Sequence, residues 1–127
     1  MMKHSDEFIA LVNDVLSRID TCELEDVKDL IDQGQNNVVL IDVRDLEEYS
    51  QGFIQGAMHL SRGMLEVKII QTIPNKDADI ILYCGGGNRS ALAAENLNKM
   101  GYQHVRSMNQ GYKGWVKAGF DVVKENK

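Results

Sequence analysis

The sequence contains no basic cluster and no long apolar run. Its 127 residues include 19 acidic and 14 basic side chains, which gives a formal net charge of −5. Because nucleic acids and anionic membranes attract clustered Lys and Arg, we expect neither as a partner. Charged residues interrupt the N-terminal stretch "MMKHSDEFIALVNDVLSRID". It therefore predicts neither a signal peptide nor a membrane span, and the expected compartment is the cytoplasm.

Cysteine and proline are also scarce. The two cysteines, Cys22 and Cys84, lie far apart in different contexts, which favours free thiols over a disulfide in a reducing compartment. No Cys/His cluster has the spacing of metal ligands, so we predict no metal and no cofactor. The single proline, Pro74, lies in a turn-like stretch. Without repeats or linkers, and with 43% hydrophobic residues, the chain predicts one compact domain.

Hydrophobic patterning indicates helices that alternate with strands. Apolar stripes predict a helix over 6–19, with Ser5 as its N-cap, and another over 24–31. Further helices are expected at 45–52, 63–73, 90–101 and 111–120, and strands at 37–43, 78–84 and 104–108. The first two strand-like runs barely alternate, which is typical of parallel strands buried on both faces. The order predicts an α/β fold with a mostly parallel sheet covered on both faces.

The stretch "YCGGGNRSALAAENL" (83–97) joins a buried strand to a helix. Cys84 ends the strand, three glycines follow, and the helical pattern begins near Ser90. Ligands bind at the carboxyl ends of parallel strands, and free N–H groups at a helix N-terminus favour anions. Glycine lets successive N–H groups converge on one point, and Arg89 adds a fixed positive charge. The pattern predicts a nucleophilic cysteine inside an anion-binding loop.

This setting favours a thiolate at Cys84. Cysteines at helix N-termini or beside arginine have pKa values well below the free value of about 8.5, and the thiolate is the nucleophile. The alternative is a structural role, in which Cys84 is a small buried residue before a glycine turn. Cys22 has neither glycines nor a cation around it, and we interpret it as structural.

Spacing separates this loop from two other anion-binding loops. A nucleotide-binding P-loop requires a Gly-Lys pair, and the sequence has none. A cysteine phosphatase needs a wider loop, because a phosphoryl group brings three oxygens. The residues between Cys84 and Arg89 are four: Gly85, Gly86, Gly87 and Asn88. Such a tight ring suits one extra sulfur atom better than a tetrahedral phosphate.

Three segments, in order, resemble the rhodanese-like sulfurtransferase family. "YCGGGNRSALAA" is similar to the family's active-site loop, where four residues separate cysteine from arginine. "VVLIDVRDLEEYSQGFIQGAMHLSRGMLE" resembles its first signature, and "NQGYKGWVKAGFDV" its closing segment. The resemblance implies a three-layer rhodanese-like fold with a central, mainly parallel five-stranded sheet over 22–127. Residues 1–21 are then an N-terminal helical extension packed on this domain.

The resemblance also implies sulfur transfer by double displacement. Cys84 would attack the outer sulfur of a donor such as thiosulfate and release sulfite. The N–H groups of residues 85–90 would hold the resulting persulfide. A thiol, including a protein thiol, or cyanide in an assay would then remove the sulfur.

Further site residues follow from the same resemblance. Arg89 would close the loop, and Ser90 would donate its hydroxyl to the sulfur. Asp42 and Arg44 would form an acidic–basic pair beside the loop, with a structural or a catalytic role. Apart from the resemblance, Arg62 precedes a glycine on a predicted loop near the site. It is a candidate for contact with an anionic donor, and the alternative is a solvated surface arginine.

The chain departs from the family pattern at the residue after the cysteine, which bears on the choice of sulfur donor. Gly85 follows the cysteine directly, where many members carry a basic or polar side chain. The loop therefore offers less positive charge to thiosulfate. The alternative function is a rhodanese-like binding or regulatory module with little catalytic activity, although the presence of Cys84 favours an enzyme. A small phosphatase or arsenate reductase on the same fold is a third interpretation, and Tyr83 before the cysteine weighs against it.

Overall fold

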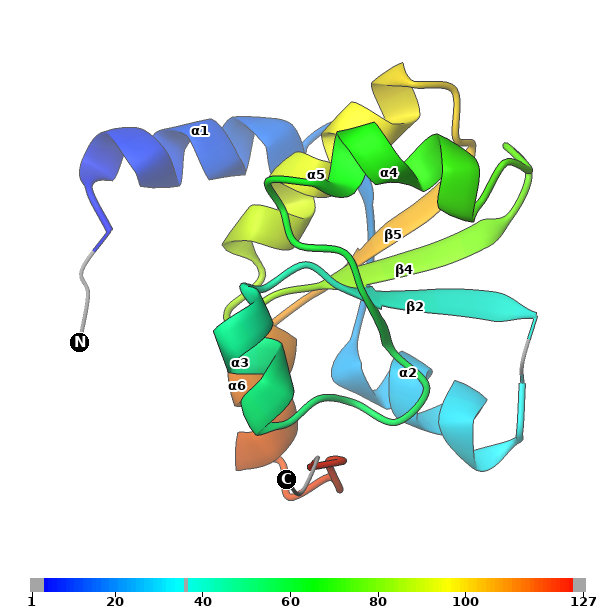
Figure 1. Ribbon diagram of the computed structural model, residues 1–127. Coiled ribbons are helices and arrows are strands. Elements are labelled where there is room, and N and C mark those ends of the chain that lie inside the picture. The colour runs from blue at the N-terminus through cyan, green and yellow to red at the C-terminus, as the bar shows by residue number, and fades with distance from the viewer. Residues whose placement is uncertain (1–3, 36, 125–127) are drawn as a thin grey trace.

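A computed structural model describes residues 4–35 and 37–124 of the chain. The ends of the expected extension and domain, 1–3 and 125–127, lie outside the described residues. The helices in Figure 1 are α1 (Asp6–Leu16), α2 (Leu24–Asp32), α3 (Leu46–Gln51), α4 (Leu65–Thr72), α5 (Asn88–Lys99) and α6 (Gly111–Lys117). The strands are β1 (Asp20–Cys22), β2 (Val38–Asp42), β3 (Met58–His59), β4 (Asp79–Tyr83) and β5 (His104–Met108).

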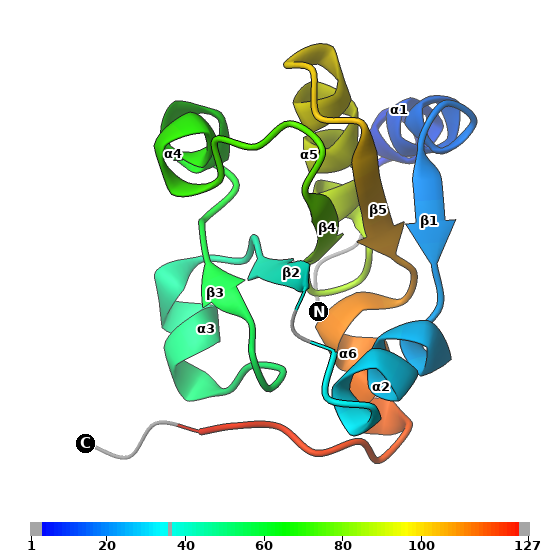
Figure 2. The same cartoon turned by 90° about the vertical axis from the view of Figure 1, so that its right-hand side faces the viewer.

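The strands form one sheet in the order β1-β5-β4-β2-β3, and every neighbouring pair is parallel. Helices α1, α4 and α5 cover one face of the sheet, while α2, α3 and α6 cover the other (Figures 1 and 2). Parallel strands need crossover connections, and here a helix supplies each one on one face or the other. The predicted three-layer α/β fold is confirmed, with a sheet that is wholly parallel.

The core lies on both faces of the central strand β4. Ile80 and Leu82 join the apolar cluster beneath α4 and α5. Ile81 and Tyr83 join the cluster beneath α2 and α6. This alternation follows from the two-residue period of a strand, and the run is apolar throughout because helices bury both faces. Trp115 is buried in the second cluster, and its indole N–H donates to the Asp121 carbonyl at 2.9 Å.

Helix α1 packs against α5. Ser5 caps it, since its hydroxyl oxygen accepts a hydrogen bond from the Phe8 N–H at 3.1 Å, as the sequence predicts. Val12 and Val15 are buried against Ala91 of α5. The helix has 11 residues, and across the described parts of the chain no helix is long and apolar enough to cross a bilayer.

Strand β1 is an element that hydrophobic patterning does not indicate. Its three residues, Asp-Thr-Cys, include no apolar run, and Cys22 is the buried one. The strand forms because it pairs with β5, with Asp20 opposite Arg106 and Cys22 opposite Met108. The sheet therefore starts at Asp20, two residues before the domain boundary expected at residue 22, and α1 ends at Leu16 instead of continuing to residue 19.

The burial of Val15 predicts how firmly α1 is attached. Val15 is 1% exposed, whereas Leu11 on the same helix is 50% exposed. We expect Val15→Ala to lower the free energy of unfolding by about 2 kcal/mol, because it removes two buried methyl groups. Urea unfolding followed by circular dichroism measures this, with Leu11→Ala as the matched control. Equal effects of the two substitutions would contradict the packing of α1 on α5.

Candidate functional site

The site lies where β2 and β4 end. Their register places Asp42 opposite Tyr83, so the residues that follow both strands meet at one edge of the sheet. Cys84 is the first residue after β4, and it is buried. The chain then turns into α5 through Gly87, whose φ of 104° lies in the left-handed region that glycine adopts readily. The strand and the helix thus fix both ends of a four-residue turn.

Three groups converge on the Cys84 sulfur. The Gly87 N–H donates to Sγ at 3.1 Å and the Ser90 N–H at 3.3 Å, while the Ser90 Oγ lies 3.5 Å from it. Both N–H groups belong to the start of α5, where backbone donors have no partner inside the helix. Together with the helix dipole, they stabilise negative charge on the sulfur. The loop therefore directs two backbone donors and a helix N-terminus at one thiol sulfur.

A buried hydroxyl pair fixes Ser90. Its Oγ lies 2.7 Å from the Ser107 Oγ and donates to the Gly87 carbonyl at 3.2 Å. Both serines are buried, so each hydroxyl needs such a partner. The sequence does not reveal Ser107 of β5, because nothing in "HVRSM" distinguishes it from a surface serine.

Arg89 lies across the loop and is paired with Glu48 of α3. The distances are 3.2 Å from Nη1 to Oε1 and 3.5 Å from Nη2 to Oε2. Partial burial by itself would raise the pKa of Glu48, but the hydrogen bonds from Arg89 and from the Asp45 N–H lower it below its usual value. Both side chains are consequently charged at neutral pH. The sequence does not reveal this partner, which lies 41 positions away.

Asp42 and Arg44 form a buried ion pair beside the loop. Arg44 Nη2 donates to Asp42 Oδ2 at 2.7 Å and to the Gly52 carbonyl at 2.6 Å. The guanidinium also lies over the Tyr112 ring, 3.9 Å from its centroid. Tyr112 in turn donates its backbone N–H to the Cys84 carbonyl at 2.7 Å. The pair is thus linked through Tyr112 to the Cys84 backbone, which fits the structural interpretation better than a catalytic one.

A cavity of about 610 Å³ opens over Cys84. Its lining comes from residue 4, α1, α3, the loop, the start of α5 and α6: His4, Phe8, Glu48, Cys84, Gly85, Gly86, Asn88, Arg89 and Lys113. Arg62 is not among these residues, because it lies before α4 and pairs with Glu66 at 2.7 Å. The structure therefore brings the predicted loop residues together but places Arg62 away from the cavity.

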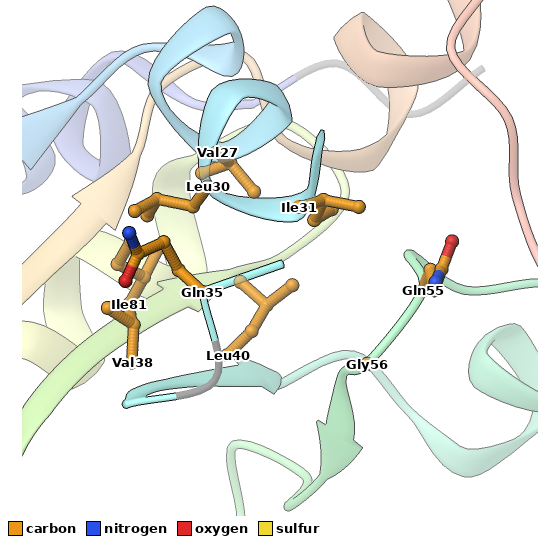
Figure 3. A pocket seen from close by; sticks show the side chains of 9 residues that line it. All are labelled: Val27, Leu30, Ile31, Gln35, Val38, Leu40, Gln55, Gly56 and Ile81. Carbon is orange, nitrogen blue, oxygen red and sulfur yellow. The ribbon is translucent and has the colours of Figure 1, made fainter. Parts of the chain in front are cut away.

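A second cavity, of about 210 Å³, lies between α2 and the sheet (Figure 3). Figure 3 shows Val27, Leu30 and Ile31 of α2 facing the sheet residues Val38, Leu40 and Ile81. Among the residues that the structure describes, its polar side chains are Gln35 and Gln55, and no nucleophile or charged group lines it. It lacks the chemistry of a catalytic site.

The other cysteine lies outside both cavities. Cys22 ends β1 and packs against Leu24 and Met108 in the core. Burial raises the pKa of its thiol to about 11, so it is protonated and unreactive at neutral pH. The two cysteines are free thiols, as predicted. Within 4–35 and 37–124, no group of three or more His, Cys, Asp or Glu side chains is arranged to hold a metal ion.

Comparison with known proteins identifies the family. A family model described as "Rhodanese-like domain" matches residues 23–118. The chain belongs to the rhodanese-like family. A protein of Allochromatium vinosum named sulfurtransferase is 31% identical over 113 residues, covering 89% of this chain and 96% of the relative. The Escherichia coli thiosulfate sulfurtransferase PspE is 37% identical over 67 residues, covering 53% of this chain and 64% of that protein.

A solved structure shares the whole rhodanese-like fold. It comes from Rhodopseudomonas palustris and is described as a protein of unknown function, a possible tyrosine phosphatase. It matches with a TM-score of 0.80 at 31% identity, covering 97% of this chain and 99% of that one. The family expected from the sequence is confirmed, and the named relatives support a sulfurtransferase family. The family match begins at residue 23, so the segment that brings His4 and Phe8 to the cavity lies outside it.

The rhodanese-like loop leaves no room for a side chain at Gly111. This residue starts α6 with a φ of +59°, and an added Cβ would lie 2.7 Å from the Gly85 carbonyl carbon and closer still to the Cys84 oxygen. We expect Gly111→Ala to lower the free energy of unfolding by about 3 kcal/mol or more and to displace the loop. Gly63→Ala is the control, since its Cβ would meet nothing within 4 Å. Urea unfolding compares the two, and equal stability would contradict the close approach of α6.

The buried Asp42–Arg44 pair makes a second prediction. Arg44→Met should lower the free energy of unfolding by about 3–5 kcal/mol, because it leaves the Asp42 carboxylate buried without its partner. Asp42→Asn combined with Arg44→Met should recover part of this loss, since no buried charge then remains. Thermal and urea unfolding test both variants. A single substitution that leaves stability unchanged would rule out the structural role.

Proposed function

We propose that the protein is a sulfurtransferase that carries sulfane sulfur as a persulfide on Cys84. The observation that supports this most is the convergence of the Gly87 and Ser90 N–H groups on the Cys84 sulfur, at 3.1 and 3.3 Å. These donors are placed to hydrogen-bond the anionic persulfide that the reaction forms. The names of the relatives point to the same chemistry.

The proposed reaction has two displacements. The Cys84 thiolate attacks the outer sulfur of a donor such as thiosulfate. A bond forms between the two sulfurs, the S–S bond of the donor breaks, and sulfite leaves with the electron pair. An acceptor thiolate then attacks the terminal sulfur of the persulfide and releases the Cys84 thiolate. Each step is an exchange at sulfur that consumes no oxidant and needs no bound cofactor.

The residues around Cys84 have distinct proposed roles. The N–H groups of residues 85–90 surround the transferred sulfur. The Ser90 hydroxyl lies 3.5 Å from the Cys84 Sγ, and it has to turn away from the Gly87 carbonyl to donate to the sulfur. Arg89 closes the ring, held in place by Glu48. The Asp42–Arg44 pair positions Tyr112, whose backbone N–H holds the Cys84 carbonyl. None of these roles requires a side chain at Gly85.

A cysteine phosphatase is the second candidate, because the Rhodopseudomonas palustris neighbour is described as a possible tyrosine phosphatase. Two features of the site weigh against it. The ring closes after four residues, which leaves little space for three phosphoryl oxygens. The Glu48 carboxylate also occupies Arg89 and places a negative charge in the cavity, where it would repel a phosphate dianion.

Intact-protein mass spectrometry tests the persulfide. Incubation with thiosulfate, polysulfide or an organic persulfide should add about 32 Da, the mass of one sulfur atom. Cys84→Ser should abolish the gain. Cys22→Ser should retain it, because burial keeps the pKa of the Cys22 thiol at about 11 and the thiol protonated.

Two results would overturn the proposal. If no donor changes the mass of the wild-type protein, the chain is a binding module instead of an enzyme. If Cys84 is required for hydrolysis of an aryl phosphate, the phosphatase candidate is correct.

A further inference from the structure

We propose that the cavity over Cys84 selects sulfane sulfur donors that join an anionic head to an apolar body. Lys113 of α6 binds the head, and Phe8 of α1 binds the body. This inference rests on the proposed function, since it names the substrate class of the same site. It is carried by the charges and the apolar surface that line the cavity.

The charge balance of the cavity leaves Lys113 unpaired. Residues 85–87 are glycines and contribute no side chains. The Arg89 charge is balanced by Glu48 at 3.2 Å. The Lys113 side chain, in contrast, makes no hydrogen bond or ion pair with the residues that the structure describes. Its backbone N–H donates to the Gly85 carbonyl at 3.0 Å, so its position beside the loop is fixed. An anion that enters the cavity therefore meets Lys113 as its available cation.

Phe8 provides an apolar wall. Its side chain is half-buried against the cluster of Val12, Val15 and Ala91, and it also lines the cavity. The His4 ring lies beside it, with 5.0 Å between centroids. An ion pair of 2.6 Å between Arg18 and Glu95 also ties the segment after α1 to α5. The wall is thus held in place by packing along the length of the helix.

The size of the cavity argues for an organic donor. Its volume of about 610 Å³ lies within the range of about 300–1,000 Å³ that is typical of sites for organic ligands. Inorganic thiosulfate has five heavy atoms and would leave most of this space, including the Phe8 wall, without contact. A donor with a phenyl-sized substituent would use both the cation and the apolar wall.

Organic thiosulfonates have this chemistry. The Cys84 thiolate attacks their outer sulfur and forms the persulfide bond. The bond between the outer sulfur and the sulfonyl sulfur breaks, and a sulfinate leaves with the electron pair. No proton, oxidant or reductant enters this step. The sulfonyl oxygens suit Lys113, and the organic substituent suits Phe8.

Donor preference tests the role of Phe8. For the wild type, we expect kcat/KM to be about tenfold higher with benzenethiosulfonate than with methanethiosulfonate. This is the ratio expected if the phenyl group buries ~50 Å² more apolar surface than the methyl group. Phe8→Ala should bring this ratio close to one. Leu11→Ala, on the exposed side of the same helix, should leave the ratio as in the wild type. A ratio that Phe8→Ala does not change would overturn the inference.

Salt dependence tests the role of Lys113. Lys113→Met should lower kcat/KM for thiosulfate about three- to tenfold and flatten its dependence on ionic strength. Lys117→Met is the matched control, because Lys117 lies one turn along α6 and is not part of the cavity. Equal effects of the two substitutions would overturn the inference.

Binding of an unreactive analogue separates this inference from the proposed function. Benzenesulfonate should bind to the Cys84→Ser protein, and Phe8→Ala and Lys113→Met should each raise its Kd, as followed by NMR titration. If benzenesulfonate binds in this way but no donor adds sulfur to the wild-type protein, sulfur transfer is refuted and the cavity assignment is supported. If the protein takes up sulfur but neither donor kcat/KM nor analogue Kd changes in the Phe8→Ala and Lys113→Met variants, the cavity assignment is refuted and sulfur transfer stands.

Discussion

The two backbone N–H groups at the start of α5 that donate to the Cys84 sulfur are the constraint on which the rest of the site depends. They reach the sulfur because Gly87 adopts a left-handed conformation and because β4 ends one residue before the cysteine. The loop is held from the other side by α6, whose first N–H groups donate to the Cys84 and Gly85 carbonyls. The glycine at 111 is required there because the two backbones nearly touch. The strand and the two helices thus position backbone donors around the Cys84 thiol, and these donors need no further side chain from the loop.

Charge is arranged around this loop in two different ways. The Asp42–Arg44 pair is buried and hydrogen-bonded on several sides, so it acts within the fold. The Arg89–Glu48 pair is partly exposed at the cavity and leaves little net charge there. The positive potential at the sulfur therefore comes mainly from backbone N–H groups and the helix terminus. Such a source is fixed in place by the fold, whereas a flexible side chain would have to be ordered on binding.

Local sequence patterns predict the central strands of the sheet and the cysteine loop. The strands β2 and β4 are apolar runs that only a doubly covered sheet explains, and the four-residue spacing from Cys84 to Arg89 indicates the loop. Strand β1 was not predictable, because its three residues are an edge strand that exists through pairing with β5. Glu48 and Ser107 were missed for the same reason, since their roles depend on contacts with residues 41 and 17 positions away. Phe8 and Lys113 meet at one cavity only after α1 and α6 have packed.

The most direct test of the account is a crystal structure of the protein after reaction with a sulfur donor. The account predicts one additional sulfur bonded to the Cys84 Sγ, enclosed by the loop and within hydrogen-bond distance of N–H groups of residues 85–90. A sulfur that points out of the loop into the cavity, without contact to these N–H groups, would contradict the central claim that the backbone holds the transferred atom.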